Sequence, residues 1–363
     1  MKASREDDED DAEGEDRASA QPGRDRAVSP APREDPDERA VDATLRPKTF
    51  AEFTGQGKVV ENLKTWIRAA KAGGRPLDHI LFTGAPGLGK TTLAHLVAAE
   101  MGARLVPTSG PVLEKAGELA SVVSKLRRGE ILFVDEVHAL RKNVSECLYS
   151  AMEDFKIDMI IDQGPYARTL RFQLERFTLI AATTRAGRLL KPFRERFGVQ
   201  ERLVPYTPDE LATILERSAD VLGCGLAKDA ARTIATRSRG TPRVANRLLS
   251  RARDVAVAAG SKTVTVPLAQ KALAMLGVDD DGLDEVDRKI LQTIARHGGQ
   301  PVGLKTIAIA VDEEDETVED VYEPYLIQQG LLAKTPRGRL LTDRGLELAG
   351  APPRPRDSQA HLF

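Results

Sequence analysis

The chain has 363 residues, which is enough for two or three domains of ordinary size, and 41% of them are hydrophobic, which is sufficient for globular cores. Its net charge of −2 is unevenly distributed, because residues 1–40 carry 14 acidic against 7 basic side chains, a charge of −7 that leaves +5 for the remainder. This balance is compatible with nucleic-acid binding without demonstrating it, and an aromatic content of only 4% argues against a large stacking platform for single-stranded nucleic acid.

The cysteines and the hydropathy pattern indicate the compartment. Cys147 and Cys224 stand far apart without a CxxC pair, which favours a reducing compartment and argues against a structural zinc site. No apolar run approaches the ~20 residues that span a bilayer, and the first residues lack the apolar core of a signal peptide. We therefore expect a soluble, cytoplasmic protein with no membrane contact.

Residues 1–42 are rich in Asp, Glu, Arg, Pro and Ala, and the first aromatic residue of the chain is Phe50. Such a segment buries too little apolar surface to offset the entropy lost on ordering, so we predict disorder. It could shield a basic surface, although an inert solubilising extension is the simpler interpretation. The segment 351–363 has the same character.

Residues 43–206 alternate short apolar runs with helical patterns. The runs 80–82, 131–134 and 177–181 are continuous and bounded by glycine or charged residues. Strands that are apolar on both faces are typical of a parallel sheet covered by helices on both sides. We therefore predict an α/β large domain here.

Two further units follow. Residues 207–277 read as wholly helical, which predicts a small all-α domain. Residues 278–350 have helical patterns near 286–297, 303–310 and 316–329, then two short apolar runs around a basic turn at 335–339. Helices followed by a basic hairpin are typical of a winged-helix domain.

The strongest motif runs from Gly84 to Thr91, Gly-Ala-Pro-Gly-Leu-Gly-Lys-Thr, and matches G-x-x-x-x-G-K-[ST] between an apolar strand and a helical pattern. Glycines such as Gly87 and Gly89 let backbone N–H groups close around phosphate oxygens, and the helix N-terminus adds partial positive charge. Lys90 is expected to reach the β and γ phosphates, and the Thr91 hydroxyl to ligate Mg²⁺. A chance glycine-rich turn is the alternative.

The run 131–134 ends in Asp135 and Glu136. Asp135 is expected to hold Mg²⁺, through water, and Glu136 to polarise the attacking water, because phosphoryl transfer depends on positioning and charge neutralisation. An acidic pair at a strand end is often only a solvated loop. Nearby His138 invites a metal interpretation, but no second histidine stands at metal spacing, so packing or hydrogen bonding is favoured.

Three weaker signals follow. Thr184 ends the third strand, where a hydroxyl could orient water, although threonine also simply suits strands. Arg194 and Arg196 stand between phenylalanines and in isolation read as surface charges. Arg243 falls in the first turn of a helix, where a cation opposes the helix dipole, and this hints at an external anion.

Together these elements resemble an AAA+ ATPase and, in detail, the RuvB family. The matching segments cover about Leu45 to Arg344 and are Leu45–Lys48 with Gly55-Gln56, Gly84–Thr92, Thr108–Pro111 with Glu114–Gly117, Ala151–Phe155, Ala182–Gly187, Gly240–Leu249, Glu323–Gly330 and Thr335–Arg339. The C-terminal winged helix makes the resemblance specific.

The resemblance implies roles in binding and hydrolysing ATP. It implies that Leu45 and Arg46 help to bind adenine, that Thr184 is the sensor-1 residue, and that Arg243 is the sensor-2 residue. Arg196 resembles an arginine finger that reaches the nucleotide of a neighbouring subunit, with Arg194 close by. The further residues implied to contact nucleotide are Gly87, Gly89, Lys90, Thr91, Thr92, Glu153, Asp154, Phe155 and Tyr206.

The resemblance also implies partners. The family forms a homohexameric ring that works on duplex DNA at Holliday junctions with RuvA, which recognises the four-way junction, and RuvC, which cleaves it. The segment 155–174 resembles the hairpin that docks on RuvA, although any surface hairpin could look alike. Lys334, Arg337 and Arg339 are expected to hold the DNA backbone, unless the basic hairpin serves only solubility.

The chain departs from the family pattern at three places. Ala139 and Ala181 stand where the family commonly has Arg and Gly, and we expect the chemistry to survive both. Lys334 replaces an arginine, which keeps the charge but loses the bidentate fork. Two rival functions remain, a clamp-loader subunit and a non-hydrolysing scaffold or winged-helix regulator. The winged helix argues against the first, and the intact set of acidic and basic site residues against the second.

Overall fold

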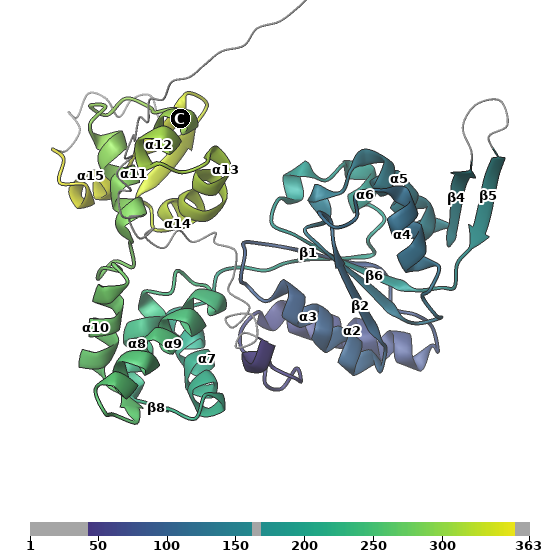
Figure 1. Ribbon diagram of the computed structural model, residues 1–363, viewed down its shortest axis with the longest axis horizontal. Coiled ribbons are helices and arrows are strands. Elements are labelled where there is room, and N and C mark those ends of the chain that lie inside the picture. Colours follow the sequence, from purple (N-terminus) through teal and green to yellow (C-terminus); the bar gives the residue numbers. More distant parts are fainter. Residues whose placement is uncertain (1–42, 162–167, 353–363) are drawn as a thin grey trace, which may run out of the picture.

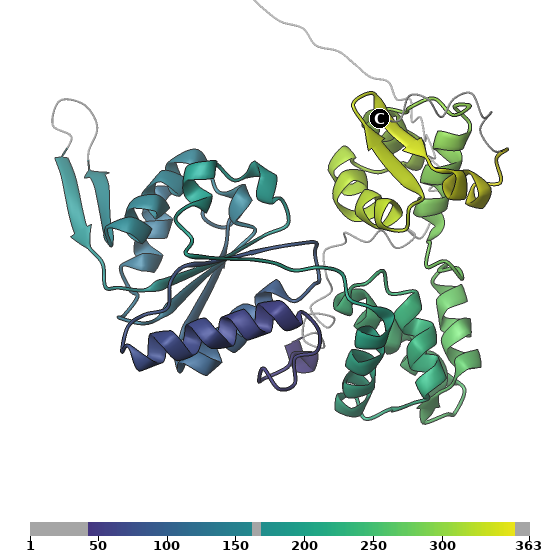
Figure 2. The same ribbon diagram turned by 180° about the vertical axis from the view of Figure 1, so that it is seen from behind.

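The computed structural model of the chain describes residues 43–161 and 168–352, which form three successive domains (Figure 1). The tail predicted at 1–42 and residues 353–363 of the tail predicted at 351–363 lie outside the described residues, as do residues 162–167 of the predicted hairpin. The large domain lies on one side of the molecule, and the two smaller domains lie together on the other side (Figures 1 and 2).

The large domain is built on a five-stranded sheet of order β2-β3-β6-β1-β7, in which every pairing is parallel. Its strands are β1 (Ile80–Thr83), β2 (Leu105–Ser109), β3 (Ile131–Asp135), β6 (Thr178–Thr183) and β7 (Val199–Arg202). Every residue of β6 is buried, as expected for a strand covered on both faces. The predicted α/β core is therefore confirmed.

Helices cover both faces of this sheet (Figure 1). One face carries α2 (Gly57–Ala72) and α3 (Lys90–Met101), and the other carries α4 (Ala116–Val123), α5 (Lys142–Glu153) and α6 (Lys191–Arg194). The apolar core beneath α2 and α3 continues without a break into the helical domain, whereas the opposite face has a separate core. The large domain and the helical domain, the lid, are thus joined by shared apolar packing.

The lid contains four helices, α7 (Pro208–Val221), α8 (Lys228–Thr236), α9 (Pro242–Ala258) and α10 (Val266–Met275). A capping box starts α7, since the Thr207 hydroxyl accepts from the Glu210 N–H and the Glu210 carboxylate accepts from the Thr207 N–H. The prediction of a wholly helical unit is wrong in one detail. The two-residue strands β8 (Gly225–Leu226) and β9 (Thr263–Val264) pair in parallel. Glycine permits this close approach, because a Cβ at Gly225 would lie 2.5 Å from the Thr263 hydroxyl.

The third domain is a winged helix. Its elements are α11 (Glu285–Ala295), α12 (Leu304–Val311), α13 (Asp315–Thr317), the π-helical turn η3 (Val318–Tyr322), α14 (Glu323–Gln328), strands β10 (Leu332–Thr335) and β11 (Gly338–Leu341), and α15 (Asp343–Leu348). The helix predicted at 316–329 is interrupted by η3. Pro324 explains the interruption, since it has no N–H to donate to the carbonyl four residues earlier.

Strands β4 (Lys156–Ile161) and β5 (Arg168–Gln173) pair antiparallel and project from the large domain on the side away from the lid (Figure 1). They correspond to the hairpin predicted at 155–174, and its docking on RuvA stays a prediction. None of the helices in the described ranges is long and apolar enough to cross a membrane.

The link between the large domain and the lid is held by the segment before α2. The side-chain amide of Gln56 donates to the Val204 carbonyl (2.6 Å) and accepts from the Val204 N–H (3.2 Å). Its neighbour Gly55 has φ 80°, and a Cβ there would lie 2.4 Å from the ring of Tyr206. The Tyr206 hydroxyl in turn donates to the Leu88 carbonyl (3.2 Å). Gly55 is therefore required both for its backbone conformation and for the close approach of the ring.

Replacing Gly55 with alanine should lower the free energy of unfolding by about 1–3 kcal/mol, because the new methyl group meets the Tyr206 ring in a left-handed backbone. Chemical denaturation measures the change. Gly57→Ala is the matched control, since nothing lies within 4 Å of its Cβ position at the start of α2. Equal stability of the two variants would contradict this account of the link.

Candidate functional site

The phosphate-binding loop follows β1 at the carboxyl edge of the sheet and leads into α3. Gly87 and Gly89 have φ values of 75° and 99°, which L side chains rarely adopt. Lys90 is the first residue of α3, and its Nζ donates to the carbonyls of Gly84 (2.8 Å) and Ala85 (2.9 Å). Burial lowers the pKa of Lys90, while Glu136 and Asp135 oppose that shift. A buried cation at the start of a helix, beside the glycines of the loop, fits a phosphate group.

Acidic residues face this loop from the end of β3. The Thr91 hydroxyl donates to Asp135 Oδ2 (3.3 Å), so that a hydroxyl and a carboxylate from two elements meet beneath the loop. Oxygen ligands of this kind are those that Mg²⁺ prefers. Among the described residues no group of three or more His, Cys, Asp and Glu side chains could hold a metal by itself. Thr91 and Asp135 thus fit a cation that is also held by phosphate.

Glu136 is bound to the end of the neighbouring strand β6. Its Oε2 accepts from the Thr184 N–H (3.2 Å) and from the Thr184 hydroxyl (3.1 Å). His138, in the short helix η1 (Val137–Ala139), places Nδ1 3.1 Å from the same oxygen and 2.9 Å from the Thr183 hydroxyl. Burial lowers the pKa of His138, and Glu136 opposes this. His138 is a hydrogen-bonding residue here, as the sequence favoured.

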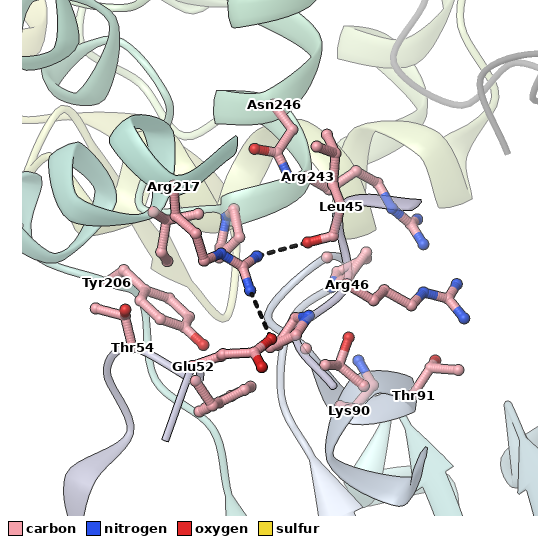
Figure 3. Close-up of a pocket in the computed structure, with 18 of the residues that line it drawn as sticks. Leu45, Arg46, Glu52, Thr54, Lys90, Thr91, Tyr206, Arg217, Arg243 and Asn246 are labelled. Carbon is pink, nitrogen blue, oxygen red and sulfur yellow. Dashed lines mark hydrogen bonds and ion pairs between the residues drawn. The ribbon is translucent and has the colours of Figure 1, made fainter. Parts of the chain in front are cut away.

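A cavity opens between the large domain and the lid, and Figure 3 shows side chains from both converging on it. Among the predicted site residues its lining includes Leu45, Arg46, Gly87, Gly89, Lys90, Thr91, Thr92, Asp135, Glu136, Tyr206 and Arg243. The first turn of α9 and its N-cap Thr241 lie directly on the loop, because a Cβ at Gly87 would be 2.6 Å from the Thr241 methyl and 2.9 Å from the Arg243 Cβ. The structure therefore brings the P-loop, the acidic pair, the N-terminal segment and the lid arginine into one cavity.

Arg217 of α7 also lines the cavity, and the sequence did not identify it. Its guanidinium donates to the Leu45 carbonyl (2.5 Å) and lies 4.0 Å from the Glu52 carboxylate (Figure 3). Burial lowers the pKa of Arg217, and Glu52 opposes this shift. No local signal distinguishes it from other arginines of an amphipathic helix, because its partner is 172 residues away. Glu52, Phe53, Thr54 and Asn246 also line the cavity and were likewise missed.

Five predicted nucleotide contacts lie elsewhere in the large domain. They are Glu153, Asp154, Phe155, Arg194 and Arg196, and none of them lines the cavity.

These residues lie away from the cavity because they stand at the opposite edge of the parallel sheet. The Phe155 ring lies 6.3 Å from that of His79 and 5.8 Å from that of Phe177, the residues just before β1 and β6. This is the amino edge of the sheet, whereas the loop leaves β1 at the carboxyl edge. Glu153 to Phe155 thus do not line the nucleotide cavity of their own chain, and their contact with nucleotide stays a prediction that requires a neighbouring chain.

Arg196 belongs to the same edge. It ion-pairs with Glu153 (2.8 Å), lies over the Tyr149 ring, and donates to the Pro192 carbonyl (2.7 Å). Its side chain is 30% exposed, and it precedes β7, whose first residue pairs with the first residue of β1. Arg194 lies beside it at the end of α6. An arginine at this edge can reach a nucleotide only on another subunit.

The basic hairpin of the winged helix differs from the expectation at one residue. Arg339 is bound to Glu323 through Nε and through Nη2 (3.1 Å), and its side chain is only 10% exposed. Arg339 is held in an internal ion pair here, and its contact with DNA stays a prediction that requires this pair to open. Lys334 is half exposed but paired with Glu319 (2.5 Å). Arg337 lies in the turn between β10 and β11 and is exposed.

Comparison with known proteins gives consistent matches along the chain. Three family models match successive parts of the chain. Residues 45–203 match the Holliday junction DNA helicase RuvB P-loop domain, and residues 206–279 match the RuvB AAA lid domain. Residues 280–349 match the RuvB C-terminal winged helix domain. Holliday junction branch migration complex subunits RuvB are similar to the chain. That of Myxococcus xanthus is 52% identical, over 90% of this chain and 96% of that protein. That of Methanoregula boonei is 53% identical, over 88% and 95%.

A solved structure, the Thermotoga maritima RuvB Holliday junction branch migration motor, superposes with a TM-score of 0.78 at 44% identity. The match covers 85% of this chain and 99% of that one. The same three-domain architecture is therefore present in a crystallised relative.

Replacing Arg217 with methionine should weaken binding of a fluorescent adenine nucleotide by about 10-fold or more, since a charged hydrogen bond that fixes the Leu45 segment is worth about 1.5–3 kcal/mol. Titration of the fluorescence gives the affinity. Arg232→Met is the control, because Arg232 forms an exposed ion pair with Asp209 on the same domain. Unchanged affinity in the Arg217 variant would contradict the assignment of this residue to the site.

Proposed function

Because the chain belongs to the RuvB family, we propose that it is an ATP-driven motor that moves duplex DNA during branch migration of Holliday junctions. The observation that carries this proposal is the cavity between the large domain and the lid, which gathers Lys90, Thr91, Asp135 and Glu136. The same chain ends in a winged helix with a basic hairpin. A nucleotide site and a DNA-binding domain in one chain are what a translocating ATPase requires.

Within the cavity each residue has a distinct role toward ATP. Lys90 would exchange its two backbone carbonyls for phosphate oxygens, and the N-terminus of α3 adds partial positive charge. Thr91 and Asp135 would hold Mg²⁺, which supplies neutralisation of phosphate charge. Glu136 would accept the proton of the attacking water, and Thr184 would orient it. Arg243 would sense the phosphates from the lid.

A second subunit completes this site. Arg196 lies at the amino edge of the sheet, remote from the cavity of its own chain, so it would serve the cavity of a neighbouring chain together with Arg194. Glu153 would hold Arg196 at that subunit interface. A closed ring is the assembly in which every chain both gives and receives this arginine, and we propose a homohexamer. RuvA, bound through the β4–β5 hairpin, and RuvC are the proposed protein partners.

Backbone contacts suit a motor, because translocation cannot depend on base identity. Arg337, exposed at the tip of the β10–β11 hairpin, and Lys334 on β10 would contact phosphates. Lys334 must leave Glu319 to do so.

Mixing two inactive variants tests the shared site. Arg196→Ala and Glu136→Gln should each lose most of the ATPase activity, since an arginine finger is worth about 10³–10⁵ in rate. Mixed rings should regain hydrolysis and ATP-dependent branch migration of a synthetic four-way junction with RuvA, because some interfaces combine an intact Glu136 with an intact Arg196.

The control mixes Glu136→Gln with Lys90→Ala. Both defects lie in the same cavity, so no interface of that mixture has a complete site and activity should stay absent. Activity in the control, or none in the first mixture although rings form, would refute a site shared between subunits.

Replacing Arg337 with glutamine should weaken duplex DNA binding by a similar factor on unrelated sequences and reduce the slope of log affinity against log salt concentration by about 0.9, the loss of one phosphate contact. Fluorescence anisotropy over a salt series measures both quantities. Lys289→Gln removes a cation that pairs with Glu285 on α11 and should change neither. A loss of binding confined to one DNA sequence would argue for base recognition instead.

A further inference from the structure

We propose that the ion pairs joining Arg185 to Asp320 and Glu316 form a releasable latch that keeps ATP hydrolysis low until DNA binds the winged helix. This inference rests on the proposed function and concerns how its two halves communicate.

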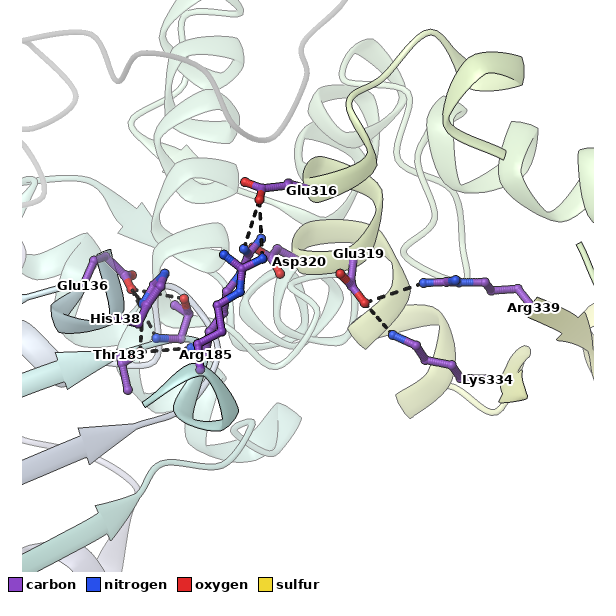
Figure 4. Close-up of polar contacts among 11 residues, drawn as sticks. Glu136, His138, Thr183, Arg185, Glu316, Glu319, Asp320, Lys334 and Arg339 are labelled. Atoms are coloured by element: carbon purple, nitrogen blue, oxygen red, sulfur yellow. Dashed lines mark hydrogen bonds and ion pairs between the residues drawn. The ribbon is translucent and has the colours of Figure 1, made fainter. Parts of the chain in front are cut away.

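The latch begins beside the catalytic residues. Arg185 follows Thr184 directly, and its backbone N–H donates to the Thr183 hydroxyl (3.1 Å). Its guanidinium crosses to the winged helix, where it binds Asp320 and Glu316 (3.3 Å). Figure 4 shows Arg185 extending from the large domain to these two carboxylates. A side chain next to the strand end that holds Glu136 is thus fixed by another domain.

The same short helical segment also holds the basic hairpin. Glu319, in η3, binds Lys334 (2.5 Å) and lies 3.7 Å from Arg339 (Figure 4). Glu323, at the start of α14, also binds Arg339. Asp320 and Glu316 lie on the side of the segment that faces Arg185. One helical segment therefore has acidic contacts in two directions, toward the end of β6 and toward the hairpin.

The contacts at the end of β6 hold Glu136 and Thr184 in an arrangement that does not favour hydrolysis. Glu136 Oε2 accepts from both the N–H and the hydroxyl of Thr184 and lies 3.1 Å from His138. A carboxylate oxygen saturated by these donors is a poor proton acceptor for water, and a Thr184 hydroxyl engaged with Glu136 is not available to orient that water. Freeing Oε2 and the Thr184 hydroxyl for the attacking water requires these two side chains to separate, and Arg185 follows Thr184 directly at that point.

A second interdomain contact shows which ion pair can open. Arg239 of the lid binds Asp284 (2.7 Å) and Asp287 (2.5 Å) of the winged helix, and Asp287 is fully buried. Breaking a buried pair leaves an uncompensated charge and is strongly unfavourable. Both arginines are 13% exposed, so the difference lies in their partners: Glu316 and Asp320 are 68% and 33% exposed and can be hydrated when the pair opens, whereas Asp287 cannot. The winged helix thus stays attached to the lid while the Arg185 contact opens.

In this proposal the phosphates of bound DNA cause the ion pairs of Arg185 with Asp320 and Glu316 to open. Phosphate oxygens compete with Glu319 for Lys334, and the loss of that pair weakens the hold of the hairpin on η3, where Arg339 remains 3.7 Å from Glu319. The opening is favoured further because the phosphates of an incoming duplex repel Glu316 and Glu319, which are both partly exposed.

The decisive variant is Glu316→Gln combined with Asp320→Asn in the full chain. Without DNA its hydrolysis rate should rise about fivefold, the effect expected of losing exposed ion pairs. The ratio of rates with and without duplex DNA should fall correspondingly. The rise should appear in kcat rather than in KM, because the P-loop contacts are untouched. Glu314→Gln, which removes an exposed charge from the same acidic segment, should behave as the parent.

The outcomes separate the two proposals. A parent protein whose hydrolysis ignores DNA would contradict the proposed function and the latch with it. A parent stimulated by DNA, with a double variant stimulated to the same degree from the same basal rate, would overturn the latch alone. So would a double variant that assembles normally but hydrolyses more slowly than the parent.

A distance measurement reports the latch even in an inactive variant. Spin labels at Lys142→Cys on α5 and Ile309→Cys on α12, both highly exposed sites, are placed in a Cys147→Ser, Cys224→Ser background. Duplex DNA should add longer distances to the parent distribution. The double variant should show them before DNA is added, and retention of the parent distribution would overturn the proposal.

Discussion

The phosphate-binding loop and Arg196 lie at opposite ends of the same parallel strands, and the rest of the account depends on this separation. The strand β1 has four residues, a length of about 13 Å, and the loop leaves it at one end while Arg196 lies near the other. No side chain spans that distance around a filled core. Arg196 can therefore act only on the phosphates of a neighbouring chain, whereas Arg243 reaches the loop of its own chain from the lid.

The common direction of the parallel strands also brings the nucleotide-site residues together at the carboxyl edge of the sheet. Strands β1, β3 and β6 end together there, so the loop, the acidic pair and Thr184 meet without long connections. The lid covers this edge through α9, and the winged helix reaches it through Arg185. Each of the three domains thus contacts the place where phosphate charge changes during hydrolysis. A motor benefits from this proximity, because cleavage of the terminal phosphate changes the charge and the hydrogen-bond acceptors at this place.

Much of this could be predicted from the sequence, because the residues involved are adjacent in the chain. Gly84 to Thr91 carries its own turn geometry, and Asp135 with Glu136 follows an unmistakable buried strand. Residues that act through distant partners could not be found in this way. Arg217 reaches Leu45, and Arg185 reaches Asp320, which is 135 residues away. Neither shows a local pattern that distinguishes it from a solvated arginine.

For two sets of predicted site residues the structure shows contacts that the sequence does not reveal. Arg339 reads as a surface cation because its hairpin is basic, yet Glu323 from a preceding helix neutralises it inside the domain. Glu153 to Phe155 resemble nucleotide contacts, and only the direction of the strands shows that they belong to the opposite edge. In each case the residue type was informative, but its neighbours in space decided its role.

The dependence of hydrolysis on assembly tests the shared site most directly. The ATPase rate per chain should be measured over a range of protein concentrations, with the assembly state followed by light scattering in the same samples. The account predicts almost no hydrolysis from dilute single chains and a rate per chain that rises in parallel with the fraction in rings. A rate per chain that stays constant and high where only single chains exist would contradict it.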